Sequence, residues 1–499
     1  MTKNKFSISI SYPSFESSKG TPFLSQNRQF QWTHTGNVIY PVIPATAATL
    51  LKQNDYKVFW DDAIAQKLNY QQWFNKLKKN KPNLIVIESK TPVIKQHWEI
   101  INQIKKEATK IRNWKLKIVL MGDHVTALPE ESLKNSKVDY ILTGGDYDFM
   151  LLNLADHLTK KTPLEPGFYF RQTSGSGFET SGKFALKHHN LDSLPIIDRK
   201  LTQWQLYAYN NTNYKYKPGA YIMSGRDCWW GKCSFCSWTT LYPGNNFRCF
   251  SVKHTIAEIE NLVNNFKVKE IFDDSGTLPI GPWLKELCQE LIKRGLNKKV
   301  KIGCNMRFGA LNQDQYNLMK QAGFRFILYG LESANQLTLK KINKNNLVKN
   351  VLPTLKMVKT AKLEPHITIM IGYPWETKKD TLKTINFAKQ IFKQGLTNSM
   401  QATIIIPYPG TPLFAECQKS NLLETSNWDD YDMQHKIMSS SLSEVELKKL
   451  TQNLFKGIIT PKFIFKQIIS VRSIEDVKHL GNYAVKFIQK LKDFSANDN

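Results

Sequence analysis

Three cysteines, Cys228, Cys233 and Cys236, fall within nine residues and are the strongest chemical signal in the sequence. They follow an apolar run at 220–223, so we expect them on a loop at the carboxyl end of a strand. Thiolates at this spacing suit an iron–sulfur cluster or a zinc ion. Because a cubane cluster has more irons than three cysteines can ligate, one iron would stay open, as is typical of catalytic metal sites.

A structural zinc ion is the alternative for these thiolates. It would need a fourth ligand, and Cys249 and His254 lie close enough in the sequence to be candidates. We favour the cluster because of the polar segments further along the chain. No chemical role is assigned to the other four cysteines, for which packing is the default: Cys249, Cys288, Cys304 and Cys417.

The second half of the chain carries polar or glycine-containing segments directly after apolar runs. Taken alone, Asp273 is compatible with a helix cap and Glu332 with a solvated loop. Residues that follow successive parallel strands, however, meet at one edge of the sheet, where the active sites of such folds lie. Packing alone does not explain their order. The segments are 272–277, 304–307, 329–333, 369–374 and 407–412.

The cysteine triad and the order of these five segments carry a resemblance to a known family. Residues 216–415 resemble the radical SAM superfamily, specifically the branch with an N-terminal cobalamin-binding domain. The usual triad there is Cys-x3-Cys-x2-Cys, whereas this chain has one extra residue between Cys228 and Cys233. We expect that residue to lengthen the loop without removing a ligand. The resemblance implies a [4Fe–4S] cluster on Cys228, Cys233 and Cys236, with S-adenosyl-L-methionine (SAM) bound at the open iron.

The resemblance also implies contacts to SAM. Phe235, just before the third cysteine, resembles the aromatic residue beside the adenine, and Glu332 resembles a glutamate that contacts the SAM amino group. Arg307 would help to position SAM. The full set of candidate SAM-site residues is Phe235, Asp273, Asp274, Asn305, Arg307, Glu332 and Gly372.

Two turns in the first part of the chain, within 122–130 and 138–146, resemble the signature turns of the cobalamin-binding module. Their glycines would let the backbone approach a large ligand. The module's Asp-x-His-x-x-Gly motif is absent, so a histidine-ligated cobalt is not expected, and His124 fits a turn residue that is hydrogen-bonded to backbone equally well. A degenerate domain that has lost its ligand is the alternative. The candidate cobalamin contacts are Gly122, His124, Thr126, Gly144 and Gly145.

The activity implied by the resemblance is cleavage of SAM to a 5′-deoxyadenosyl radical, followed by cobalamin-dependent methyl transfer to an unactivated carbon. It implies a small-molecule or peptide substrate and an electron donor such as flavodoxin or ferredoxin. Oxidative cyclisation or rearrangement without methyl transfer is the alternative within this architecture. A methylthiotransferase would need further cluster cysteines in the N-terminal domain, and residues 1–227 contain none. The alternative to an enzyme is a non-catalytic regulator that binds cobalamin or zinc.

Apolar runs that alternate with helical stretches predict parallel sheets covered by helices on both faces. Residues 1–160 predict a doubly wound, Rossmann-like (flavodoxin-like) cobalamin-binding domain, and 161–215 a hairpin and linker. Residues 216–415 predict a partial (β/α)6 TIM-like radical SAM barrel, and 416–499 a helical C-terminal region. The strands of the first domain are expected at 38–43, 57–60, 84–88, 117–122 and 140–143.

Capping residues mark the helix starts of the second half. Thr255 and Glu258 form a candidate capping box, and Asn312 and Thr377 precede two further helices. The six strands of this region are expected at 220–223, 268–272, 299–304, 325–329, 366–371 and 402–406.

The length predicts two or three domains, since 499 residues exceed one compact core, and the composition is ordinary for a soluble globular protein. The net charge is +27, but only ten of the 69 basic residues are Arg and the lysines are scattered, so we expect a solvated surface and no nucleic-acid partner. No apolar run approaches the roughly 18 residues of a membrane span. The first residues lack the apolar core of a signal peptide, and seven cysteines do not suit a secreted disulfide framework, so the cytoplasm is the expected location.

Overall fold

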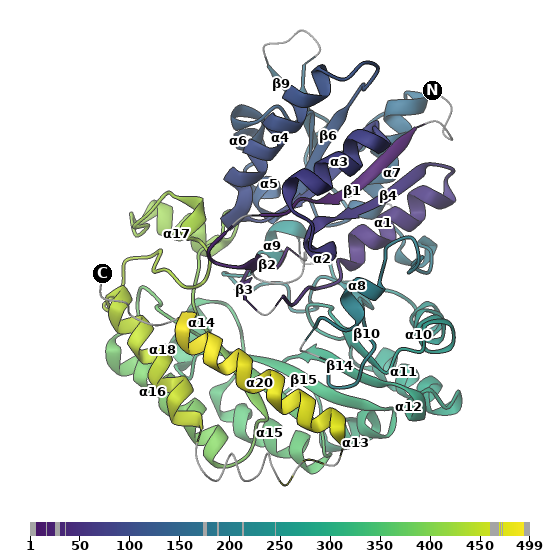
Figure 1. Cartoon of the computed structure of the whole chain (residues 1–499). Helices are drawn as coiled ribbons and strands as arrows, with labels where there is room; N and C mark the ends of the chain where they lie inside the picture. Colours follow the sequence, from purple (N-terminus) through teal and green to yellow (C-terminus); the bar gives the residue numbers. More distant parts are fainter. Residues whose placement is uncertain are drawn as a thin grey trace. The chain divides into compact units, whose positions relative to one another are not determined.

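A computed structural model describes residues 6–15, 17–24, 30–34, 36–172, 177–186, 189–211, 214–244, 246–459, 469, 471 and 473–493. The chain divides into two compact units. The first unit comprises Met1–Asn210, Cys236–Asn246 and Tyr408–Thr411, and the second comprises Asn211–Phe235, Phe247–Pro407 and Pro412–Asn499. Each unit is built around its own sheet (Figure 1).

The first unit contains a seven-stranded sheet in the order β4-β1-β5-β6-β7-β8-β9. The first five of these strands are parallel, and β8 and β9 extend the sheet as an antiparallel hairpin. Numbered along the chain, the parallel strands have the order 2-1-3-4-5 of flavodoxin-like folds, which confirms the predicted fold class. The bounds are β1 Ser7–Tyr12, β4 Lys57–Asp62, β5 Leu84–Ser89, β6 Lys117–Gly122, β7 Tyr140–Leu142, β8 Phe168–Arg171 and β9 Phe178–Thr180.

Helices connect these strands because the central strands are buried on both faces and need cover on each side. Helices α1 and α7 pack against each other. A short hairpin, β2 Thr21–Pro22 and β3 Trp32–Thr33, precedes α1. The helices are α1 Val42–Gln53, α2 Ala63–Gln66, α3 Tyr70–Asn80, η2 Thr91–Val93, α4 Ile94–Thr109, α5 Asp123–Ala127, α6 Pro129–Asn135, α7 Tyr147–Lys160, η3 Leu191–Ser193, α8 Gln205–Ala208 and α9 Trp238–Leu241.

Two expectations for the first unit need correction. The strand expected at 38–43 is wrong, because residues 38–41 form neither strand nor helix and α1 begins at Val42, where the buried residues Val42 and Ile43 start its first turn. The central strand β1 was not predicted, because serine alternates with isoleucine along it. Those serines are nevertheless buried: Ser9 hydrogen-bonds Ser11 at 2.8 Å and Asp61 at 2.5 Å.

The second unit contains six parallel strands in chain order, β10-β13-β14-β15-β16-β17, which confirms the predicted β/α repeats. Strand β10 pairs with β13 and β17 pairs with β16, so the sheet is an open partial barrel. A two-residue ladder joins β11 Gly225–Arg226 to β12 Arg248–Cys249. The strands are β10 Gly219–Ile222, β13 Glu270–Asp273, β14 Lys301–Met306, β15 Phe324–Glu332, β16 Glu364–Ile371 and β17 Ser399–Ile404.

Two predicted helix caps are confirmed, since Asn312 and Thr377 both form capping boxes. The predicted box at Thr255 is wrong: the helix starts one turn earlier, where the Ser251 side chain accepts a hydrogen bond from the backbone N–H of His254. The connecting helices are α10 Val252–Phe266, α11 Pro282–Lys293, α12 Leu296–Lys299, α13 Gln313–Gln321, α14 Gln336–Lys341, η4 Val348–Asn350, α15 Val351–Thr360 and α16 Lys378–Lys393.

The C-terminal region is mainly helical, and α18 packs against α16 and α20. Across the described ranges, no helix combines the length and the apolar character needed to cross a membrane. The elements are α17 Pro412–Lys419, η5 Trp428–Asp430, α18 Glu444–Ile458 and α20 Ile474–Asp493.

Candidate functional site

The cysteine loop begins just after β11, at the strand-end side of β10. The Cys228 backbone N–H donates to the side chain of Asp227 at 2.6 Å, and the Cys228 Sγ atom lies 3.0 Å from the hydroxyl of Thr277. Asp227 has a left-handed backbone with φ of 74°. The short β11–β12 ladder closes the loop at its base, because Gly225 faces Cys249 across the two strands.

The second cysteine lies in an electropositive, buried position. Burial raises the pKa of the Cys233 thiol, while the nearby cations Lys344 and Arg307 oppose that rise. Such cations stabilise a thiolate, which is the form that binds a metal or cluster. The third cysteine, Cys236, opens the segment Cys236–Asn246, which belongs to the first unit.

Within the described ranges, no three His, Cys, Asp or Glu side chains lie close enough together to hold one metal ion. The two candidate ligands for a zinc ion have different surroundings. Cys249 is exposed on β12, whereas the His254 ring stacks on the Phe250 ring, with the ring centres 4.5 Å apart. The assignment of Cys228, Cys233 and Cys236 to a cluster therefore stays a prediction that rests on their loop and its surroundings.

The carboxylates after β13 bond mainly to protein groups. Asp273 is fully buried and accepts hydrogen bonds from the backbone N–H groups of Ser224 (3.2 Å) and Ser275 (3.1 Å) and from the Ser275 hydroxyl (2.6 Å). It therefore ties the end of β10 to the end of β13. Asn305, at the end of β14, donates to the Ser275 carbonyl at 2.8 Å and reaches Asp274 at 3.5 Å. These residues support the strand-end surface on which a ligand would lie.

A buried ion pair joins Glu332 to Lys344. The Lys344 Nζ atom lies 2.8 Å from Glu332 Oε1, and their side chains are 12% and 8% exposed. Thr368 reaches the other Glu332 oxygen at 3.4 Å, and the Lys344 ammonium lies 5.8 Å from the centre of the Phe235 ring. Gly330 makes room for the pair, because a Cβ atom there would lie 2.2 Å from Glu332 Oε1. Glu332 is therefore an acceptor for an ammonium group.

Sequence reasoning missed Lys344. It occupies a turn between α14 and η4, flanked by Asn343 and Asn345, whose backbones are left-handed at φ 51° and 55°. Asparagine tolerates this conformation, so the Asn-Lys-Asn run predicts a turn. The partner of the lysine depends on the tertiary fold and leaves no signal in the sequence.

The enlarged cysteine loop is held by Arg307 and two tryptophans. The Arg307 guanidinium lies 4.8 Å from the ring centre of Trp230 and 5.4 Å from that of Trp229. Arg307 also donates to the Lys344 carbonyl, and the Trp230 indole N–H donates to the Asn343 carbonyl at 2.7 Å. These cation–π contacts and hydrogen bonds hold the loop, so the predicted SAM residue Arg307 anchors it.

Gly372 directly follows β16 and has a left-handed conformation, with φ of 91°. A Cβ atom here would lie 3.2 Å from Leu447 of α18 and 3.3 Å from Ile404 of β17. The glycine is therefore required by the turn and by close packing within the second unit, and its contact with SAM stays a prediction.

The two predicted turns of the first unit lie side by side. The Thr126 hydroxyl donates to the Gly122 carbonyl at 2.6 Å and accepts from the Gly144 N–H at 3.2 Å. Gly122 has φ of 136°, and a Cβ atom there would lie 2.0 Å from the carbonyl oxygen of Ser89. At Gly144 and Gly145 a Cβ atom would strike the rings of two aromatic residues of the same unit. The three glycines therefore let other atoms approach the backbone closely, as expected. In this structure the atoms that approach belong to the protein.

His124 is fully buried between protein side chains. Its Nδ1 atom lies 3.2 Å from the Thr91 hydroxyl, and its Nε2 atom lies 3.1 Å from a carboxylate oxygen of Glu131. Both ring nitrogens therefore have partners, but these are side chains and His124 lies within α5, so the expected turn residue bonded to backbone is wrong in both respects. Nearby, Lys90 and Asp123 form a buried ion pair at 2.9 Å that the sequence did not reveal.

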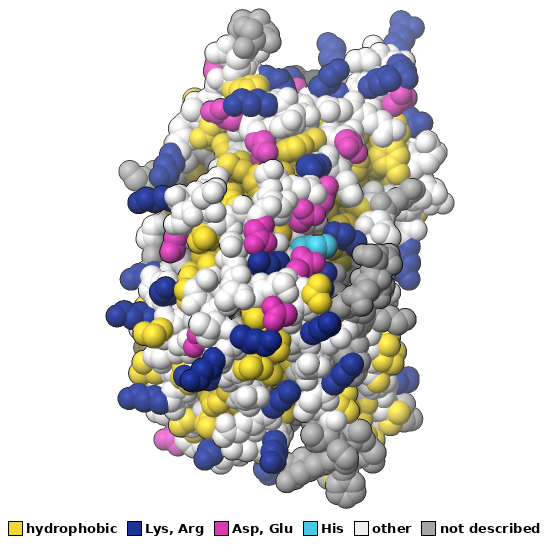
Figure 2. Space-filling model, turned by 90° about the vertical axis from the view of Figure 1, so that its left-hand side faces the viewer, with side chains coloured by type: hydrophobic (Ala, Val, Ile, Leu, Met, Phe, Trp, Pro, Cys, Tyr) yellow, Lys and Arg dark blue, Asp and Glu magenta, His cyan; other side chains and the backbone are white. Residues whose placement is uncertain are grey.

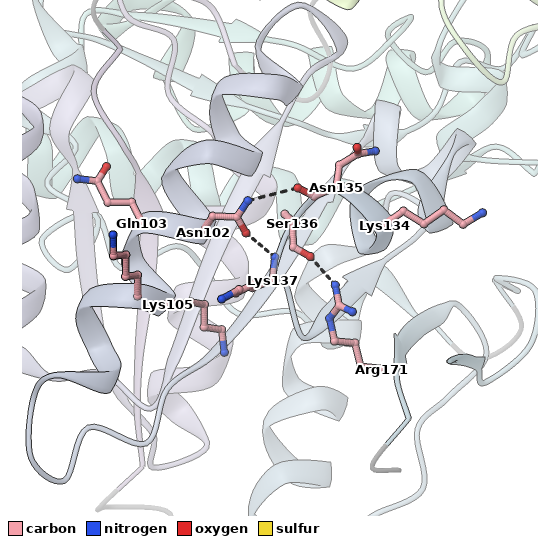
Figure 3. Close-up of a pocket in the computed structure, with 9 residues that line it drawn as sticks. Asn102, Gln103, Lys105, Lys134, Asn135, Ser136, Lys137 and Arg171 are labelled. Atoms are coloured by element: carbon pink, nitrogen blue, oxygen red, sulfur yellow. Dashed lines mark hydrogen bonds between the residues drawn. The ribbon is translucent and has the colours of Figure 1, made fainter. Parts of the chain in front are cut away.

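A pocket of 980 Å³ lies at the opposite edge of this sheet, beside the starts of β6 and β7. Figure 3 shows the Asn102 side chain bridging the Asn135 carbonyl (3.3 Å) and the Lys137 N–H (2.7 Å). Lys105 and Arg171 donate to backbone carbonyls just before β6 and β7, at 2.9 and 3.0 Å. These two cations bind backbone carbonyls of the protein itself, and the predicted ligand-binding turns lie at the carboxyl ends of the strands, at the other edge of the sheet. We therefore do not place the active site in this pocket.

The molecular surface agrees with the expectation that the lysines behind the net positive charge are scattered. Figure 2 shows Lys and Arg side chains spread over one face, with Asp and Glu side chains among them. The excess of lysine is therefore dispersed on this face rather than gathered in one basic patch.

Comparison with known families identifies residues 222–388 as matching the Radical SAM superfamily. Among curated proteins, an uncharacterized methyltransferase of Pyrococcus horikoshii is 25% identical over 431 residues, which cover 85% of this chain and 88% of the relative. An anaerobic magnesium-protoporphyrin IX monomethyl ester cyclase of Cereibacter sphaeroides is 26% identical over 413 residues, covering 81% of this chain and 64% of the relative.

Among solved structures, the chain is similar to TsrM of Kitasatospora setae, a radical S-adenosylmethionine methyltransferase with cobalamin and a [4Fe–4S] cluster bound. The TM-score is 0.66 at 13% identity, and the match covers 93% of this chain and 90% of that one. At this identity the likeness shows a shared fold over nearly the whole chain.

Proposed function

The chain is a radical SAM enzyme, and we propose that it is a cobalamin-dependent methyltransferase that acts on an unactivated carbon of a small molecule or peptide. The observation that carries the proposal is the cysteine loop, which lies in the region matching the superfamily and has a buried cysteine beside two cations. When bound, the [4Fe–4S] cluster and SAM supply a 5′-deoxyadenosyl radical, and cobalamin supplies the methyl group.

The residues of the cysteine loop and of the strand ends in the second unit fit the first two cofactors. Cys228, Cys233 and Cys236 would ligate the cluster, and Lys344 and Arg307 would stabilise its thiolates electrostatically. Glu332 already accepts one buried ammonium, that of Lys344, which matches the proposed contact with the SAM amino group. Phe235 offers an aromatic face beside these groups.

The first unit fits cobalamin through its fold and its two strand-end turns. Thr126 bridges Gly122 and Gly144, so the turns present one continuous edge. In parallel sheets of this strand order, ligands bind at the carboxyl ends of the strands. His124 is engaged by Thr91 and Glu131, so we propose no cobalt ligand from this chain.

Oxidative cyclisation without methyl transfer is the second candidate. It is favoured by the similarity to the anaerobic cyclase, which spans 81% of this chain. The two candidates differ in the fate of SAM, because a methyltransferase consumes SAM as a methyl donor as well as a radical source.

The location and the reductant are also proposals. An odd number of cysteines, seven, with three of them within nine residues, does not suit a secreted disulfide framework, so we place the enzyme in the cytoplasm. Reduction of the cluster requires an electron donor, for which a flavodoxin or ferredoxin is suitable.

The test is product analysis under anaerobic conditions. The full chain, reconstituted with iron, sulfide and hydroxocobalamin, is incubated with SAM, a reductant and candidate substrates. Methyl transfer predicts both 5′-deoxyadenosine and S-adenosylhomocysteine, with label from methyl-labelled SAM in the product. 5′-Deoxyadenosine without S-adenosylhomocysteine would instead favour the cyclase. Absence of both products, with the cluster intact, would contradict radical chemistry.

A further inference from the structure

The turn at 342–345 is tied to the cysteine loop through its backbone. Three successive carbonyl groups of this turn, those of 342–344, accept hydrogen bonds. The donors are the Ser234 backbone N–H at 2.9 Å, the Trp230 indole N–H at 2.7 Å and the Arg307 guanidinium. Ser234 and Trp230 belong to the loop that carries the three cysteines. The turn therefore has a fixed position against that loop.

This turn places the cation Lys344 in the interior of the second unit. Its ammonium lies 2.8 Å from Glu332 Oε1 and 5.8 Å from the ring centre of Phe235, the residue before the third cysteine. The two charged side chains are only 12% and 8% exposed. Charges that are shielded from water act on their surroundings more strongly than charges at the surface. The Lys344–Glu332 pair is therefore placed to influence the cysteine loop.

Both charges of the pair act on Cys233. Burial raises the pKa of this thiol, and the Lys344 ammonium opposes that rise more strongly than Arg307 does. The Glu332 carboxylate raises the pKa of Cys233 further, but its effect is smaller than that of Lys344. The two charges of the pair therefore do not cancel at the cysteine, where the positive one has the larger effect.

Reduction of an iron–sulfur cluster transfers one electron from the donor to the cluster, and no bond forms or breaks. The net charge of the cluster becomes more negative by one, so a nearby cation favours the reduced form and a nearby anion the oxidised form. We infer that Lys344 and Glu332 set the reduction potential of the cluster, with Lys344 raising it and Glu332 lowering it. The inference rests on the proposed cluster and adds a role for this pair before SAM binds.

The test is a redox titration of the full chain, reconstituted anaerobically with iron and sulfide and kept free of SAM. Titanium(III) citrate is the reductant, and the EPR signal of the reduced cluster gives the midpoint potential. Lys344→Met should shift the reduction equilibrium at least about 10-fold toward the oxidised cluster, which for one electron lowers the midpoint by about 59 mV. Glu332→Gln should shift it at least about 3-fold in the opposite direction.

Further variants separate the effect of charge from that of structure. Lys344→Arg keeps the charge and should stay within about 3-fold of the wild-type equilibrium. Lys341→Met is the matched control, since it removes an exposed lysine, and it should stay within about 2-fold because surface charges are screened.

A double variant keeps the test decisive where Lys344→Met does not fold. Lys344→Met combined with Glu332→Gln leaves no unpaired buried charge, so the double variant should fold. Its reduction equilibrium should lie at least about 10-fold further toward the oxidised cluster than that of Glu332→Gln alone.

The outcomes separate the inference from the proposed function. A wild-type chain that binds no iron would overturn both. With about four irons bound, midpoints that do not respond to the loss of Lys344, alone or in the double variant, would overturn the inference alone. Shifts in the same direction in Lys344→Met and Glu332→Gln would also overturn it, because the pair would then act by shaping the site and not by its charges.

Discussion

Replacing His189 by Gln should remove a pH-dependent contribution to the stability of the first unit. The His189 ring bridges two carboxylates: Nδ1 lies 2.7 Å from Asp146 and Nε2 lies 3.1 Å from Glu165. It also stacks on Phe149, with ring centres 4.4 Å apart. Asp146 directly follows the Gly-Gly turn, so this imidazole holds the turn proposed to border cobalamin.

The magnitude follows from the pKa of the imidazole. Burial alone would lower it, but hydrogen bonds to Asp146 and Glu165 raise the pKa of His189 from 6.5 to about 9. Because the pKa in the folded chain is the higher one, the stabilisation is fully present below pH 6.5 and is lost as the pH rises through 9. The shift of about 2.5 units corresponds to at most about 3.4 kcal/mol, and solvent screening through the partly exposed Glu165 reduces our expectation to about 2 kcal/mol.

The assay is the melting temperature of the unfolding transition of the first unit, measured from pH 6 to 10. With about 2–4 °C per kcal/mol for a unit of this size, the wild type should melt about 4–8 °C above His189→Gln at pH 6, and the gap should close by pH 10. His157→Gln is the control, since His157 bonds the Thr162 carbonyl rather than a carboxylate. A constant gap across this range would refute the argument, as would titration of His189 near pH 6.5 by NMR.

Two further predictions concern close packing and a buried charge. Gly122→Ala should lower the unfolding free energy of the first unit by at least about 3 kcal/mol, because its Cβ would lie 2.0 Å from a carbonyl oxygen of β5. Gly36→Ala, at a positive φ with open space around it, should cost about 1 kcal/mol, and equal effects in denaturant titrations would contradict this reasoning. Lys344→Met should lower the unfolding free energy of the second unit by about 3–5 kcal/mol, because it leaves the Glu332 carboxylate buried and unpaired. Lys341→Met, which loses only a cation–π contact on the surface, should cost less than about 1 kcal/mol, and a reversed order of the two would disprove the importance of the pair.

Local signals explain why the sequence predicts most of the fold. The strands of the second unit contain short apolar stretches that can be recognised locally, and residues such as Asn312 and Thr377 mark the helix starts by their own hydrogen bonds. Strand β1 escaped prediction because Ser9 and Ser11 break its apolar pattern, and their burial depends on Asp61, some 50 residues away.

The site was predictable only in part, because its key pairings are tertiary. The spacing of Cys228, Cys233 and Cys236 marks them as candidate ligands, whereas the partner of Glu332, Lys344, comes from a turn without a motif.

The most direct test of the central claim is the metal content of the purified chain. After anaerobic reconstitution with iron, sulfide and hydroxocobalamin and removal of unbound material, we predict about four irons and about one cobalt per chain. Cys233→Ala should lose the iron, whereas Cys249→Ala, at an exposed position on β12, should retain it. Zinc in place of iron, or loss of the metal on replacing Cys249, would contradict the assignment of a [4Fe–4S] cluster to Cys228, Cys233 and Cys236.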